Sequence, residues 1–299
     1  MVMTNTDFQK YLNDQLQEQK DLYVPVDCNW YDKFLVQKVK CTNIHPNPDD
    51  EFCFPNVGPS YRIIGEYEKK FRDDMHKGGA PLMEPLIVLK AHPRGYILQN
   101  GHHRWAAALK LGVKKVPVQV VNMMLPDDIK RVIEESTNVR RVTLDLDEVV
   151  FRDKDDENIE KIPSLFMSKN KKRIRLGIPA LFRYLRAHDY DIWVYSRDYY
   201  STDDVAKLFK KYYVSVDGII TGTGNKFANQ ESEKLQNIKN MVADKYKTTI
   251  HIDNDMLLVT RGKGGEFEEH ELDADDEKWS KDIIEFISKL DDKEVDSKS

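Results

Sequence analysis

The chain has 299 residues, enough for two domains of ordinary size, and 40% of them are hydrophobic and 32% charged, as in globular proteins with a charged surface. The net charge of −5 gives no general attraction to nucleic acid. No run of about 18 apolar residues is present, so we expect no transmembrane helix and no membrane partner. The three cysteines form no C-x-x-C pair, which favours buried thiols in a reducing compartment, the cytoplasm.

The amino-terminal part is expected to be a helical extension, residues 1–36, followed by a small mixed α+β domain, residues 37–124. Apolar spacing predicts a helix over 5–19 and another over 60–73. The remaining predicted elements of this domain are a short strand from Gln37, strands at 84–90, 95–99 and 116–121 and a helix at 105–111, which Gly112 ends.

Between the second of these strands and the helix lies Gly101-His102-His103-Arg104. Glycine permits a tight turn, and the start of the helix offers free N–H groups and a positive dipole end. Two imidazoles and one guanidinium add hydrogen-bond donors, and arginine can hold a phosphate bidentately. These four residues therefore form a candidate phosphate site. Two adjacent histidines without a third ligand do not predict zinc.

The string from Pro85 to Val118, with Gly101-His-His-Arg104-Trp-Ala-Ala107 at its centre, resembles the ParB/sulfiredoxin superfamily. The resemblance implies that the loop contacts the phosphates of a nucleotide such as ADP, ATP or CTP. His102 stands where sulfiredoxins have their reactive cysteine, which argues against sulfiredoxin chemistry. Asn100 replaces an aspartate that is common before the glycine. The helix-turn-helix DNA reader of partition proteins has no clear counterpart.

A linker helix is expected within residues 125–140, and a second domain over 141–290. Its first strand runs into Asp145-Leu-Asp147, and later strands end at Ser196 and Asp253. Alternation of strands and helices predicts a parallel sheet with crossovers, in which ligands bind at the carboxyl ends of the strands. Lys234 opens the helix before the last of these strands. Clustered carboxylates need a cation among them, and hard oxygen ligands suit Mg²⁺.

These residues resemble four motifs of the haloacid dehalogenase (HAD) superfamily over about residues 141–262. The motifs are matched in order by Asp145 with Asp147, by Ser196, by Lys234 with Lys226 as runner-up, and by Asp253. The resemblance implies a Rossmannoid three-layer α/β domain with little or no cap, and a Mg²⁺-dependent phosphatase. Asp145 would be the nucleophile, Asp147 the general acid and base, and Ser196 and Lys234 the phosphoryl holders, with Asp145, Asp147 and Asp253 as metal ligands. The last motif here reads Asp-Asn-Asp, which leaves the role of Asp255 open.

The rest of the chain carries weaker signals. The basic run at 169–175 and the acidic run at 266–277 are expected to be solvated, a closing helix is predicted from Trp279 to Leu290, and the tail, 291–299, is expected to be disordered.

Two alternatives to a phosphatase stay open. One is a bifunctional kinase and phosphatase, in which the first domain transfers phosphate from a nucleotide with Asp49, Asp50 or Glu51 as base. The other is a nucleotide-switched, DNA-associated module without enzymatic activity. The class of phosphorylated substrate, including nucleic acid, and the oligomeric state are not fixed by the sequence.

Overall fold

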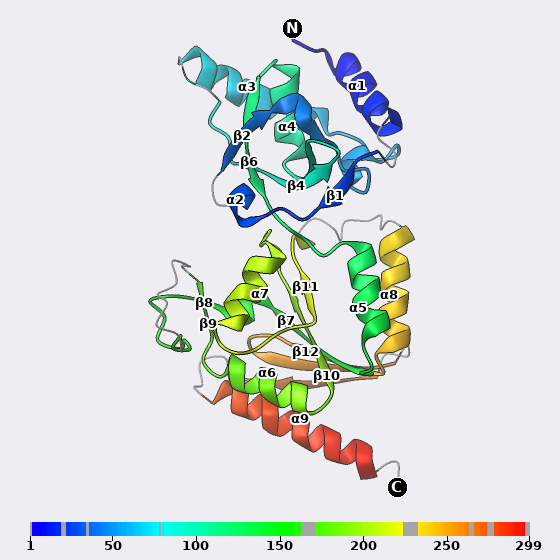
Figure 1. Ribbon diagram of the computed structural model, residues 1–299, viewed down its shortest axis with the longest axis vertical. Helices are drawn as coiled ribbons and strands as arrows, with labels where there is room; N and C mark the ends of the chain where they lie inside the picture. Colours follow the sequence, from blue (N-terminus) through cyan, green and yellow to red (C-terminus); the bar gives the residue numbers. More distant parts are fainter. Residues whose placement is uncertain are drawn as a thin grey trace. The chain divides into compact units, whose positions relative to one another are not determined.

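In the computed structural model the chain forms two compact units, Met1–Asn122 and Met123–Ser299, each with its own six-stranded sheet (Figure 1). We call them the first and the second unit. The described residues are 2–18, 22–33, 36–77, 79, 81–162, 172–223, 233–262, 266–273 and 278–296. Within these ranges, no helix is both long and apolar enough to cross a membrane.

The sheet of the first unit is mixed, with β4 paired in parallel to β6 and antiparallel to β5 and β1. Its strands are β1 (Val24–Val26), β2 (Gln37–Lys40), β3 (Ile44–His45), β4 (Leu86–His92), β5 (Tyr96–Asn100) and β6 (Lys115–Val120). The helices are α1 (Asn5–Glu18), α2 (Trp30–Lys33), α3 (Tyr61–His76) and α4 (His102–Lys110). The expected mixed α+β domain is therefore observed.

The amino-terminal segment belongs to the core of this unit. Phe8 of α1 is fully buried, and its ring meets those of Trp105 and Phe52 edge-on at 5.9 and 6.3 Å between centroids. Leu12, one turn later on α1, is buried beside them. Residues 1–36 are thus part of the first unit, because the apolar side of α1 completes its core.

The sheet of the second unit has the strand order β11-β10-β7-β12-β13-β14. The four parallel strands are β7 (Arg140–Asp145), β10 (Tyr190–Tyr195), β11 (Gly218–Ile220) and β12 (Thr248–Ile252), and β13 (Met256–Arg261) and β14 (Glu266–Glu271) continue antiparallel. The chain moves outward from β7 through β10 to β11 and then returns to the other side of β7. The strand order therefore reverses at β7.

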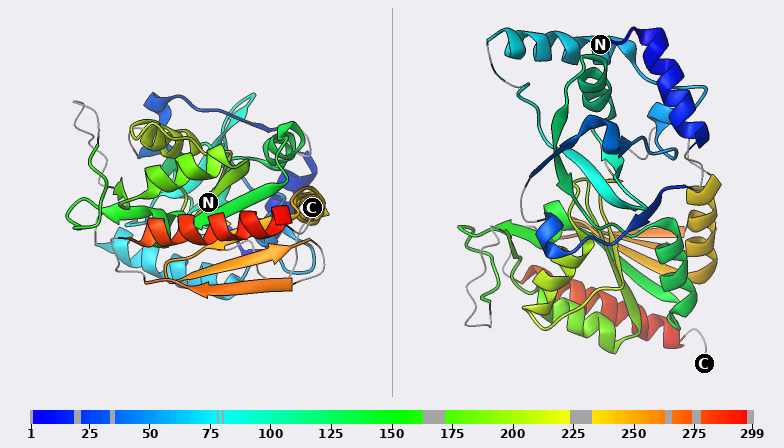
Figure 2. Two further views of the ribbon diagram at one scale, coloured as in Figure 1. Left: turned by 90° about the horizontal axis from the view of Figure 1, so that it is seen from below. Right: turned by 45° about the horizontal axis from the view of Figure 1, so that its top comes forward.

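Helices cover both faces of this sheet. The larger core joins Leu144, Val194 and Ile252 to apolar residues of α6 (Ile178–Ala187), α7 (Thr202–Lys210) and α9 (Trp279–Asp296). A smaller cluster around Trp193 lies under α5 (Pro126–Glu135) and α8 (Glu233–Lys245). Two pairs of helices, α6 with α9 and α5 with α8, lie side by side (Figures 1 and 2). The expected three layers are present, and the helix predicted as a linker packs into the second unit.

Three segments differ from the expectations. The stretch after β7 forms one π-helical turn, Leu146–Val150, and then a hairpin of β8 (Phe151–Asp153) and β9 (Lys172–Ile174), which contains part of the basic run. The acidic run begins with the edge strand β14, which the sequence did not predict, and residues 267–271 are exposed, as expected for a solvated run. Helix α9 continues to Asp296, since the Asp291 carboxylate accepts hydrogen bonds from Arg140 and Tyr190 and anchors its last turns.

Candidate active site

The parallel register of the second unit brings the ends of three strands to one edge. Tyr195 of β10 lies beside Asp145 of β7, and Ile252 of β12 lies beside Leu144. Neighbouring strands are about 4.8 Å apart, so Ser196 and Asp253, which follow β10 and β12, lie on either side of Asp145 at the end of β7. The strand order reverses at β7, which lies between β10 and β12. Open α/β sheets bind ligands at the carboxyl ends of the strands where the order reverses.

Asp145 is the last residue of β7, and its side chain caps the π-helical turn. Its Oδ1 atom accepts the backbone N–H groups of Asp147 and Glu148 at 2.7 and 2.8 Å. The other oxygen, Oδ2, makes no hydrogen bond with any described residue. One oxygen thus fixes the orientation of the half-buried carboxylate, and the other is available to contact a ligand.

Asp147 is held on both of its carboxylate oxygens by hydroxyl groups. The Ser196 Oγ atom lies 2.6 Å from Oδ2, and the Tyr200 hydroxyl donates to Oδ1 at 2.7 Å. Ser196 is fully buried. Its hydroxyl forms hydrogen bonds with Asp147 and with the backbone carbonyl and N–H groups of Asp198. The predicted pair Asp147 and Ser196 is therefore brought together.

Tyr200 was not among the residues singled out from the sequence. Burial, followed by the hydrogen bond to Asp147, raises the pKa of the Tyr200 phenol well above its ordinary value, so the hydroxyl stays a donor. Its ring packs edge-on against Phe151 of β8 at 5.3 Å. Nothing in the sequence distinguishes Tyr200 from the adjacent Tyr199, because only the course of the loop decides which ring faces Asp147.

The loop from Ser196 to Ser201 is fixed by the segment after β11. The Gly222 N–H donates to the Asp198 carbonyl at 2.9 Å, and the Thr221 hydroxyl donates to the Tyr200 carbonyl at 2.9 Å. Gly222 has a φ of +71°, and a Cβ atom there would come within 2.3 Å of the Tyr199 ring. Glycine is thus required both for the backbone conformation and for the close approach of the loop.

Asp253 lies at the tight turn between β12 and β13. Its carboxylate is exposed and accepts the N–H group of Asn254 at 2.7 Å, while its own N–H donates to the Met256 carbonyl. Asp255, also exposed, accepts the Leu272 N–H on its backbone carbonyl. The turn therefore presents two carboxylates to solvent at this edge.

Asn254, between these acids, has a structural role. Its Oδ1 atom accepts hydrogen bonds from Arg175 at 2.8 Å and from Arg152 at 3.3 Å, and its carbonyl accepts the indole N–H of Trp279 at 2.9 Å. The side-chain amide thus ties the β12–β13 turn to Arg152 of β8 and to Arg175 just after β9, and the backbone carbonyl ties it to α9, so the position of the neighbouring Asp253 is fixed.

The lysine of the third motif is not placed by the structure. Lys234 lies in the first turn of α8, but its side chain is outside the described residues, and Lys226 lies outside them entirely. Across the described ranges, no group of three or more His, Cys, Asp or Glu side chains is arranged to hold a metal ion.

In the first unit, Gly101 precedes α4 with a φ of +95°, and a Cβ atom there would lie 2.6 Å from Leu86. His102 is buried, its Nδ1 atom is 3.6 Å from the Asp50 carboxylate, and burial lowers its pKa to about 4. His103 is half-buried and accepts the Ser60 N–H at 3.3 Å on Nε2, and burial lowers its pKa as well. Both imidazoles are therefore neutral at pH 7.

Arg104 lies beside these histidines and is engaged within the protein. Its guanidinium donates to the Glu84 carboxylate at 2.8 Å and to the Asn100 amide oxygen at 3.2 Å. The Glu84 side chain is 88% exposed, so an anion can replace it with little loss of packing.

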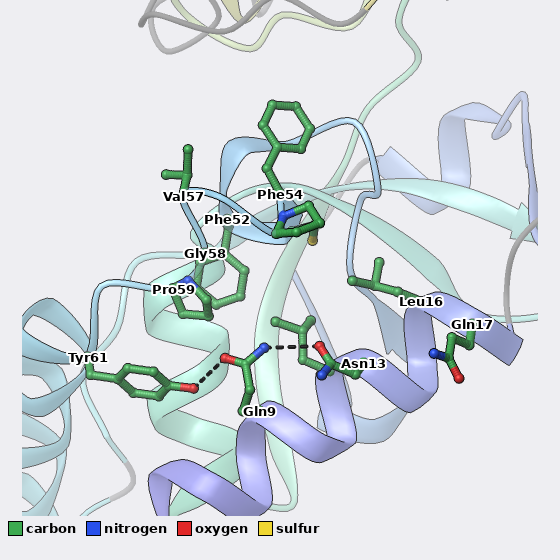
Figure 3. Close-up of a pocket in the computed structure, with 13 residues that line it drawn as sticks. Gln9, Asn13, Leu16, Gln17, Phe52, Phe54, Val57, Gly58, Pro59 and Tyr61 are labelled. Carbon is green, nitrogen blue, oxygen red and sulfur yellow. Dashed lines mark hydrogen bonds between the residues drawn. The ribbon is translucent and has the colours of Figure 1, made fainter.

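A pocket of about 490 Å³ lies between α1 and the segment 52–61 (Figure 3). One wall carries the amides of Gln9, Asn13 and Gln17, and Gln9 accepts the Tyr61 hydroxyl at 2.7 Å. Phe52 forms part of the opposite wall, and its ring also meets that of His103 at 5.1 Å. The pocket and the Gly101–Arg104 loop thus adjoin the same phenylalanine, which sequence patterns alone did not reveal.

One comparison with known proteins bears on this unit. Residues 71–137 match the ParB N-terminal domain. The match includes β4, β5, α4 and β6 and therefore the Gly101–Arg104 loop, and its last residues reach α5. An uncharacterized protein of Methanocaldococcus jannaschii is 41% identical over 83 residues, which are 27% of this chain and 30% of that protein. The chain thus contains a ParB N-terminal domain and spans less than a third of the relative it matches.

Proposed function

We propose that the second unit is a Mg²⁺-dependent phosphohydrolase of the HAD superfamily that acts through an aspartyl-phosphate on Asp145. The observation that carries the proposal is the pairing of two carboxylates at the end of β7. Asp145 keeps an open oxygen, and Asp147, two residues later, is held by Ser196 from the end of the neighbouring strand. A nucleophile beside an oriented acid is the arrangement that covalent phosphoryl transfer requires.

In the first half of the reaction, the open oxygen of Asp145 attacks phosphorus, and the bond between phosphorus and the leaving oxygen breaks. Asp147 gives its proton to that oxygen, so an alcohol departs and Asp147 becomes a carboxylate. In the second half, a water attacks phosphorus, Asp147 takes its proton, and the bond to Asp145 breaks. Inorganic phosphate leaves and both acids return to their initial state.

The donor set at this edge suits a two-carboxylate Mg²⁺ site. Asp145 ends β7 and Asp253 follows the neighbouring strand β12, and each has one oxygen without a hydrogen bond to a described residue, whereas both oxygens of Asp147 accept hydroxyl groups. Mg²⁺ is commonly bound by one or two carboxylates together with water and substrate phosphate. When bound, the ion would neutralise charge on the transferring phosphoryl group. Asp147, expected as a third ligand, accepts one hydroxyl on each oxygen, so a bond to the ion would use the remaining lone pair of one of them.

Asp145→Asn should lower the hydrolysis of an aryl phosphate by about a thousandfold or more, because the covalent step is lost. Steady-state rates with Mg²⁺ test this, and Glu148→Gln, an exposed acid of the same turn, is the matched control. Activity of Asp145→Asn within a few-fold of the parent would show that another residue is the nucleophile. A parallel screen of metabolites, nucleotides and 3′- or 5′-phosphorylated oligonucleotides would identify the substrate class.

Mg²⁺ should raise the melting temperature of the protein, and Asp253→Ala should remove that shift, because a ligand of the folded state alone stabilises it. Thermal melts with and without Mg²⁺ provide the measurement, with Asp255→Ala as the control from the same turn. If Asp255→Ala abolishes the shift and Asp253→Ala does not, Asp255 is the ligand.

A second candidate function is nucleotide binding by the first unit, and the pocket on the other side of Phe52 from the Gly101–Arg104 loop favours it. The start of α4 offers free N–H groups for phosphates, and the pocket across Phe52 has aromatic and amide walls that suit a base. The proposed ligand is ADP, ATP or CTP. If this unit also transfers phosphate, Asp50 is the acid of the segment 49–51 that contacts the loop, through His102 at 3.6 Å.

Arg104→Ala should weaken nucleotide binding by about 1.5–3 kcal/mol, the range for hydrogen bonds to charged groups. Titration calorimetry with ADP, ATP and CTP would measure it, with Arg72→Ala, an exposed arginine on α3, as the control. The hydrolysis of an aryl phosphate should be unchanged in both variants. If none of the nucleotides binds more tightly than millimolar, the loop is only a helix start and the kinase alternative fails with it.

A further inference from the structure

We infer that Tyr200 is a positioning residue for Asp147, which its hydroxyl holds in the orientation that delivers a proton to the leaving group. The inference rests on the proposed hydrolase function of the second unit. Neither the family motifs nor the comparisons assign a role to this tyrosine.

The geometry sets Tyr200 apart from an ordinary core tyrosine. A carboxylate has two oxygens, and those of Asp147 accept one hydroxyl each, from Ser196 at 2.6 Å and from Tyr200 at 2.7 Å. One hydrogen bond would leave the group free to turn about its terminal bond, while two from different directions fix its plane. Ser196 alone therefore cannot orient Asp147.

The Tyr200 hydroxyl is itself held in place. The residue lies just before α7, and its carbonyl accepts the hydroxyl of buried Thr221 at 2.9 Å. Its ring is braced by Phe151 at an interplanar angle of 87°. These contacts come from the segment after β11 and from β8, so two parts of the chain distant in sequence set the position of one oxygen atom.

This arrangement matters most when the leaving group is a poor one. A phenolate such as p-nitrophenolate departs with little help, whereas an alkoxide needs the Asp147 proton as the bond to phosphorus breaks. Loss of the orienting contact should therefore slow alkyl phosphates far more than p-nitrophenyl phosphate. A purely structural defect would slow both to the same extent.

The experiment compares Tyr200→Phe with Tyr199→Phe, which removes the neighbouring hydroxyl of the same loop, in the full-length protein with Mg²⁺. For Tyr200→Phe we expect kcat on an alkyl phosphate to fall by about tenfold or more and kcat on p-nitrophenyl phosphate to change by less than about threefold, with KM unchanged for both. Tyr199→Phe should match the parent on both substrates. Equal losses on the two substrates, or no loss on either, would overturn the inference.

A second measurement does not depend on activity. A hydroxyl proton held between Tyr200 and Asp147 should exchange slowly and give a proton NMR signal that is absent in Tyr200→Phe, shifted in Asp147→Asn and retained in Tyr199→Phe. If this signal is present in a parent that hydrolyses no phosphate ester, the contact exists but the proposed function is wrong. If the parent is active and the signal is missing, the positioning role is wrong and the hydrolase proposal stands.

Discussion

The register between three parallel strands is the constraint on which the candidate active site depends. Because β10 and β12 both pair with β7, residues that are more than 100 positions apart in the chain share one edge of the sheet. The buried side chains of Leu144, Val194 and Ile252 fix this register, since a shift of one residue would turn each of them away from the core. The packing of these apolar side chains in the core therefore sets the position of Asp145 at the end of β7.

The two acids at the end of β7 differ in their hydrogen bonds. Asp145 receives two backbone N–H groups on one oxygen and keeps the other open, and Asp147 has a hydroxyl on each oxygen. The π-helical turn between them makes this division possible, because it carries the backbone away from the strand direction immediately after Asp145. The proposed reaction uses this difference, with Asp145 as the nucleophile and Asp147 as the acid and base.

Much of this arrangement could be predicted from the sequence, and the remainder has identifiable reasons. Alternating strands and helices, with Asp145, Ser196 and Asp253 at the strand ends, indicated the parallel sheet and its edge. The hairpin of β8 and β9 was not predicted, because its strands are short and pair across an intervening segment. Tyr200 was missed for a related reason: which of two adjacent tyrosines faces Asp147 depends on Gly222 and Thr221, more than 20 residues away.

In the first unit, too, some features of the candidate site could be predicted from the sequence and others could not. The loop from Gly101 to Arg104 was evident from its residue types, and the ParB N-terminal domain match includes it. The structure adds that His102 is buried, that Arg104 is paired with exposed Glu84, and that α1 closes a pocket across Phe52. None of these follows from local spacing, because each needs a contact between distant segments. The proposed nucleotide site would use the free N–H groups at the start of α4 for phosphates and the pocket with polar and aromatic walls for the base.

The central claim is that Asp145 carries the phosphoryl group during turnover. The most direct test is to quench the full-length protein with acid during hydrolysis of p-nitrophenyl phosphate with Mg²⁺, using Asp147→Asn to slow the breakdown of the intermediate, since this leaving group departs without the Asp147 proton. Peptide mass spectrometry should then find one phosphoryl group on the peptide that contains Asp145, and hydroxylamine should remove it, as it does an acyl phosphate. Turnover with no modified peptide, or with the phosphoryl group on another residue, would contradict the claim.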